Sequence, residues 1–192
     1  SKVTPHEPAV QPAGPIVRAP DATAVYVAIA ISGMTALACQ VLWTRLLSLL
    51  FGATVYAFSL ILGVFLLGLG IGSSVGASIA RTSPQPRVAL GWCQMLLCAA
   101  MAWAAYLLMA SLPYWPINPA ISTSPWFNFQ LDLVRCLFVV LPGAILWGAS
   151  FPLALGSVPT PGQDPARLVG GVYAANTAGA IVGSLASGLV MV

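Results

Sequence analysis

The side chains that could do chemistry are few in this chain, and they form no catalytic pattern. The only histidine, His6, lies in a proline-rich leader, so the apolar segments hold no imidazole base and no haem ligand. The four acidic residues are scattered over the leader and the loops. The four cysteines lack the spacing of a zinc site or redox pair, and we interpret them as packing residues: Cys39, Cys93, Cys98 and Cys136. The sequence therefore predicts no catalytic residue, no metal site, no cofactor and no enzymatic activity.

The composition explains this scarcity of reactive groups. Of the 192 residues, 59% are hydrophobic and only 6% are charged, whereas about a quarter of the residues of a soluble domain are charged. Apolar runs near the roughly 20 residues that cross a bilayer recur along the chain. The net charge of +3 forms no basic patch, which argues against a nucleic-acid partner. We expect an all-α integral membrane protein embedded in a lipid bilayer.

Five apolar segments predict about five transmembrane helices. Residues 1–23 hold several prolines and no apolar core, and we expect a disordered cytoplasmic tail there. The membrane domain is residues 24–192, with the first span ending at residue 42 or continuing to residue 50. Because the last span is still apolar at Val192, we expect that the native chain continues beyond it. The expected spans are residues 24–50, 53–80, 88–112, 133–158 and 167–192.

The basic residues predict an orientation. With five spans, one side of the membrane carries five of them: Lys2, Arg18, Arg81, Arg87 and Arg167. The other side carries only Arg45 and Arg135. Because cytoplasmic loops are enriched in lysine and arginine, this asymmetry favours a cytoplasmic N terminus.

Small residues recur at four-residue spacing in two of the spans. Such stripes let helix backbones approach closely in lipid, where apolar surface gains nothing by meeting apolar surface. They indicate either static helix packing or a sliding seam in a transporter, and the spacing alone does not separate these. The stripe residues are Gly68, Gly72 and Gly76 in the second span, and Ala175, Gly179 and Gly183 in the last.

Polar residues within the apolar runs are candidates for structural or functional contacts. Arg45 has two interpretations. It reaches the interface beside Trp43 if the first helix ends near residue 42. If the helix continues, it needs a partner such as Gln40, Asp132 or a helix-end carbonyl. Asn176 predicts an interhelical hydrogen bond in preference to a substrate contact. Asp132 and Arg135, three residues apart, suggest a local interfacial ion pair of small energetic value.

Residues 113–130, "PYWPINPAISTSPWFNFQ", combine four prolines with several aromatics. The prolines oppose a regular helix, so we expect a loop on the membrane surface. Its aromatic side chains suit either lipid anchoring in the headgroup layer or contact with a protein partner. The candidates are Trp115, Trp126 and Phe127.

Two stretches carry a family resemblance. Residues 32–81, with "WTRLL", "FGATVYAF" and a glycine-rich helix ending in arginine, and residues 172–189, "VYAANTAGAIVGSLASGL", occur in a characteristic order. Together they resemble the membrane portion of bacterial fused transporter/spermidine-synthase-like proteins. In that family, a membrane region related to major facilitator transporters precedes a soluble aminopropyltransferase-like domain, which nothing in this chain resembles. The resemblance implies a multi-pass protein of the bacterial inner membrane.

These observations leave three classes of function. The chain supplies no catalytic groups, and five spans are too few for the two bundles of a facilitator. We therefore expect a non-catalytic, structural or accessory subunit packed against other membrane-protein subunits. The alternative is a membrane transport or anchoring domain for a polyamine-related aminopropyltransferase, whose small-molecule substrate the sequence does not identify.

Overall fold

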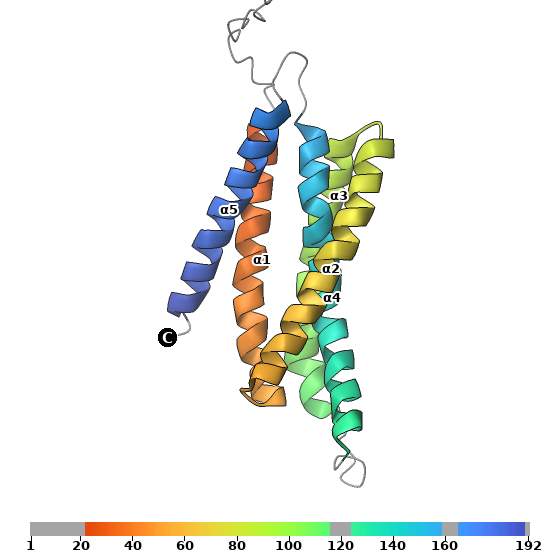
Figure 1. Cartoon of the computed structure of the whole chain (residues 1–192), viewed down its shortest axis with the longest axis vertical. Helices are drawn as coiled ribbons and strands as arrows, with labels where there is room; N and C mark the ends of the chain where they lie inside the picture. The colour runs from red at the N-terminus through yellow and green to blue at the C-terminus, as the bar shows by residue number, and fades with distance from the viewer. Residues whose placement is uncertain (1–21, 116–123, 159–164, 191–192) are drawn as a thin grey trace, which may run out of the picture.

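The computed structural model describes residues 22–115, 124–158 and 165–190, and these form a bundle of long helices (Figure 1). Five helices are long and apolar enough to cross a membrane, and the described residues contain no strand. This confirms the prediction of an all-α protein with five candidate spans. The helices are α1 (Ala22–Phe51), α2 (Val55–Thr82), α3 (Pro86–Tyr106), α4 (Pro125–Ser157) and α5 (Pro165–Val190). A π-helical turn, Leu107–Ser111, and a 3-10 turn, Leu112–Tyr114, extend α3.

Successive helices run in opposite directions, so α1, α3 and α5 start from the same end of the bundle (Figure 1). The tight turn between α1 and α2 depends on Gly52, whose φ of 88° is favoured by glycine because it has no Cβ. Thr54 then caps α2 by accepting a hydrogen bond from the Ala57 backbone N–H at 3.3 Å. We call the end of the bundle that holds this α1–α2 turn the turn end. Because successive helices are antiparallel, α2 and α4 both start there.

The fourth span differs from the sequence prediction. The helix begins at Pro125, eight residues before the expected start at residue 133, and ends at Ser157. Proline at the first helical position needs no hydrogen-bonded N–H and already has a helical φ, so Pro125 starts the helix and does not prevent it. The prediction that residues 113–130 lack regular helix is thus wrong for residues 125–130. Residues 116–123 of that loop lie outside the described residues, as do the predicted tail up to residue 21 and residues 191–192.

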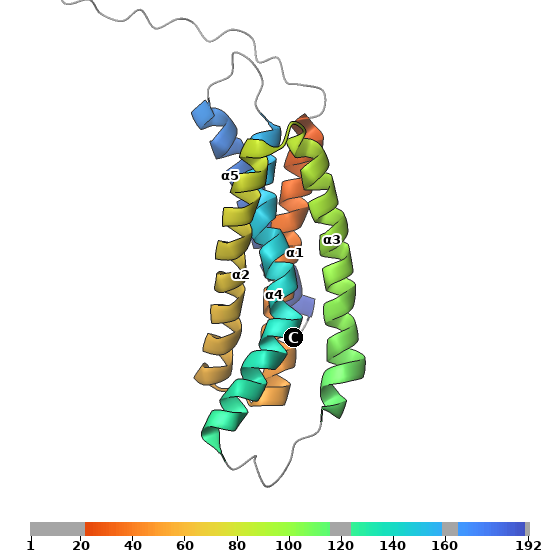
Figure 2. The same cartoon turned by 90° about the vertical axis from the view of Figure 1, so that its right-hand side faces the viewer.

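The helices form two closely packed pairs, α2 with α4 and α1 with α5. In the second view α4 lies between α2 and α3, and α1 joins the two pairs by packing on α4 (Figure 2). A large apolar core toward the turn end draws on α1 to α4, and a smaller core at the opposite end includes α5. Many large apolar side chains on the outer faces are exposed, as expected for surfaces that contact lipid.

Candidate functional site

The α2–α4 seam is built on glycines. Gly68, Gly72 and Gly76 are all buried against α4. A Cβ at Gly72 would overlap the backbone of Ile145 in α4. From the α4 side, Gly148 packs directly on the backbone of Leu69 in α2. Backbone contact on both sides leaves no flexible side chain that could move aside. The described geometry is therefore that of a close helix contact.

The α1–α5 seam is of the same kind. A Cβ at Gly179 would overlap the backbone of Ala30, and one at Gly183 would overlap that of Met34. Ala175, the first residue of this stripe, packs on the smaller apolar core. On the other side of the seam, Gly33 of α1 lies against Asn176. Within the described chain the contact is steric, and the hydrogen bond that the sequence suggests for Asn176 is not found there.

Arg45 and Gln40 occupy different faces of one continuous helix. Because α1 runs to Phe51, the interpretation that ended it near residue 42 is wrong. Trp43 is not an interfacial anchor either, since it is 3% exposed and packs on Trp147 with ring centroids 5.5 Å apart. Arg45 is exposed, six residues before the helix end, so its guanidinium can reach the headgroup layer.

Gln40 belongs to the core-facing side of α1. It lies on one helical stripe with the buried residues Ala36, Trp43 and Leu47. Its Oε1 atom is buried and has no hydrogen-bond partner within the described residues. An acceptor without a donor in the core is costly, and this one lies on the side of α1 that faces the rest of the bundle.

The two prolines inside α4 free backbone carbonyls that neighbouring helices bind. Pro142 cannot donate to Phe138 O, which instead accepts a hydrogen bond from Trp103 Nε1 of α3 at 3.2 Å. Pro152 likewise leaves Gly148 O, which accepts from Ser73 Oγ of α2 at 3.2 Å. Side chains that re-satisfy such carbonyls are how transmembrane helices tolerate proline. The prolines thus tie α4 to both neighbours.

A second set of polar contacts lies on α4 between these prolines. Trp147 Nε1 donates to Thr35 Oγ1 of α1 at 3.2 Å. Ser150 Oγ accepts from Gln94 Nε2 of α3 at 3.1 Å and donates to its own helix at Leu146 O. All four cysteines are free thiols, and the described residues contain no group of three metal-ligating side chains. These contacts hold α4 to α1 and α3.

The aromatic candidates separate into core and surface residues. Trp115 packs edge-on against Phe138, with ring centroids 6.3 Å apart, and its indole N–H donates to Ser111 Oγ at 3.0 Å. It therefore supports the fold and is unsuited to a test of docking. Trp126 is 66% exposed and stacks on Phe129, while Phe127 is half-buried. Of the three candidates, Trp126 is the one that is mostly exposed.

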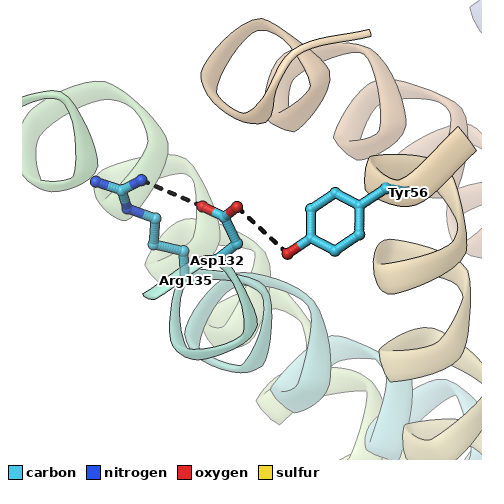
Figure 3. A network of polar contacts seen from close by, with 3 residues as sticks. All are labelled: Tyr56, Asp132 and Arg135. Carbon is cyan, nitrogen blue, oxygen red and sulfur yellow. Dashed lines mark hydrogen bonds and ion pairs between the residues drawn. The ribbon is translucent and has the colours of Figure 1, made fainter. Parts of the chain in front are cut away.

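The charged pair Asp132–Arg135 of α4 is far more buried than the sequence suggests. Arg135 Nη1 lies 3.5 Å from Asp132 Oδ1, and the two side chains are 7% and 14% exposed. Tyr56 of α2 donates from its hydroxyl to Asp132 Oδ2 at 3.5 Å, so the carboxylate lies between the two partners (Figure 3). Asp132 is the one carboxylate among residues 22–115, 124–158 and 165–190.

The sequence identified the Asp132–Arg135 pair but not its burial, because the fourth helix was expected to start at residue 133. With α4 beginning at Pro125, Arg135 lies ten residues inside the helix, about 15 Å from its end. Tyr56 carried no signal, since a tyrosine near a helix start is common at membrane interfaces. The donors to the proline-freed carbonyls, Ser73 and Trp103, depend on contacts between distant segments that no local pattern reveals.

Comparison of the chain with protein-family models, with curated proteins and with solved structures found no match. The resemblance to the membrane portion of spermidine-synthase-like proteins stays a prediction.

Proposed function

We propose that the chain is a non-catalytic accessory subunit of a larger membrane-protein complex. The observation that supports this role is the position of α5. In its most apolar window only 17% of the residues are buried, against 56% for α4, because α5 packs chiefly on α1. The open face includes Gly170 and Gly188, where an added Cβ would meet nothing within 4 Å. Small residues are used in lipid where another helix approaches.

The exposed aromatic residue Trp126 adds to this proposal. It is 66% exposed and is the second residue of α4, which begins at the end of the bundle that carries the α1–α2 turn. Aromatic residues lose little conformational entropy on binding and dominate protein contact sites. The test of the accessory role is purification of the tagged chain in native lipid particles, where a partner in fixed ratio is expected and a lone chain overturns the proposal.

The alternative, a transport or anchoring domain related to the membrane part of spermidine-synthase-like proteins, has one supporting observation. The glycine-packed pairs α1–α5 and α2–α4 meet through side chains such as Trp43 and Trp147. On that side of α1, Gln40 Oε1 has no hydrogen-bond partner among the described residues. Relative movement of two such units around a central site is how many transporters work. A lone purified chain that binds a small cation would favour this alternative.

The proposed orientation places the N terminus in the cytoplasm of the bacterium, with the α2–α3 connection on the same side. Arg81 and Arg87 flank that connection, and short loops rich in arginine stay on the inner side. In a cysteine-free background, Ser83→Cys is expected to react with an impermeant thiol reagent only after the inner face is opened. Ala53→Cys, in the α1–α2 turn, should react from outside in intact cells. The reversed pattern would refute this orientation.

A further inference from the structure

The cluster of Tyr56, Asp132 and Arg135 has unused hydrogen-bonding capacity. A guanidinium carries five N–H donors, yet among the described residues Arg135 makes one contact, the ion pair to Asp132 at 3.5 Å. Its Nε atom is buried and has no hydrogen-bond partner within the described residues. A charge that is desolvated and poorly paired is expensive, and such residues inside a membrane protein mark functional sites. The unmet donors call for an anionic oxygen.

The carboxylate of Asp132 is equally under-used. Both of its contacts, to Tyr56 Oη and Arg135 Nη1, are 3.5 Å long, at the limit of a hydrogen bond. An ionised carboxylate has about four acceptor positions, so it has room for a further donor. Tyr56 is 42% exposed, and its hydroxyl points from α2 toward the Asp132 carboxylate on α4 (Figure 3). The unmet acceptor calls for a cationic N–H group.

The depth of the cluster suits a lipid headgroup. At about 1.5 Å per residue, the 33 residues of α4 span about 50 Å, well beyond the roughly 30 Å hydrocarbon core. With the middle of α4, near Leu141, at the bilayer centre, Asp132 lies about 14 Å away from it, at the edge of the hydrocarbon layer. Arg135 lies one turn deeper. Long side chains at that depth reach phosphate groups.

We propose that this cluster binds a phosphoethanolamine headgroup from the leaflet at the α1–α2 turn end, with the ammonium on Asp132 and a phosphate oxygen on Arg135. The pair is neutral overall but dipolar, so it complements a ligand that carries both charges. A purely anionic headgroup would meet the Asp132 carboxylate without a cation to balance it. A trimethylated ammonium has no N–H to donate, so phosphocholine satisfies only the arginine.

The test uses the purified full chain, stripped of lipid in mild detergent, with the melting temperature as readout. Phosphatidylethanolamine at saturation is expected to raise Tm by about 5 °C or more beyond the rise with phosphatidylcholine or phosphatidylglycerol of the same acyl chains. Asp132→Asn should abolish this preference, because the ammonium loses its charged acceptor. Arg167→Gln, an exposed arginine on α5 at the opposite end, is the matched control and should keep the preference.

Removal of Arg135 alone leaves Asp132 without its partner, so the double variant Asp132→Asn/Arg135→Gln replaces both charges together. It is expected to fold and to respond equally to the three lipids. The proposal is overturned if the unmodified chain does not distinguish ethanolamine from choline lipids, or if Asp132→Asn keeps the distinction. Free phosphoethanolamine that stabilises as well as the lipid would also overturn it, because the site would then belong to a soluble zwitterion.

Discussion

Replacement of Gly72 with alanine is expected to lower the yield of folded protein severely, although alanine is the better helix former by about 1 kcal/mol. The added Cβ would overlap the backbone of Ile145, so α2 and α4 must separate. Overpacking of this kind typically costs about 1–3 kcal/mol, and rigid backbone on both sides places Gly72 at the upper end. The measurement is the yield of monodisperse protein in detergent, followed by its melting temperature.

The matched control for this prediction lies two residues away. Gly70 is on the opposite face of α2, and a Cβ there meets nothing within 4 Å. Gly70→Ala should therefore be neutral or should stabilise the protein through its helix propensity. Equal yields and equal melting temperatures for Gly72→Ala and Gly70→Ala would refute the close α2–α4 contact.

Truncation of Trp147 to alanine is expected to produce the largest loss among single side chains. Trp147 is 4% exposed and packs on Trp43 and on Phe65, with ring centroids 5.5 and 6.2 Å apart. It also donates a hydrogen bond to Thr35, so it links α4 to both α1 and α2. Removal of such a ring leaves a cavity that costs about 3–5 kcal/mol, which lowers Tm by roughly 10 °C or more in a chain of this length.

Two further variants separate packing from hydrogen bonding at this position. Trp147→Phe keeps most of the ring volume but loses the indole N–H. Its melting temperature should therefore fall between those of the unmodified chain and Trp147→Ala. Trp92→Ala removes a ring that is 65% exposed on α3 and should change Tm little. If Trp147→Ala melts like Trp92→Ala, Trp147 does not hold the helices together.

Much of this architecture could be predicted from the sequence, because membrane spans follow from local properties. Length and apolarity identified five helices, and the four-residue spacing singled out Gly72 and Gly179, which lie at helix contacts. Local rules failed where a residue has two roles. Proline was taken as a helix breaker, yet Pro125 starts α4, and Trp43 was taken as an interfacial residue, yet it is buried.

The candidate sites were less predictable because they depend on contacts between distant segments. Nothing local to Tyr56 indicates that its hydroxyl meets Asp132, 76 residues later. The donors that bind the carbonyls freed by Pro142 and Pro152 come from α3 and α2, and only the packing of helices around α4 brings them there. Arg135 was identified as the partner of Asp132, but its burial depends on where α4 begins.

The most direct test of the accessory role is the composition of the complex that carries the chain. The tagged chain, expressed at its native level, is extracted in lipid particles, and the mass and subunit ratio of the assembly are measured together with those of two variants. Gly188→Leu fills open space on the free face of α5, and Gly91→Leu does the same on α3. We expect a partner in fixed ratio with the unmodified chain and with Gly91→Leu, and loss of that partner with Gly188→Leu. A chain that is extracted alone, at its own mass, would contradict the accessory role.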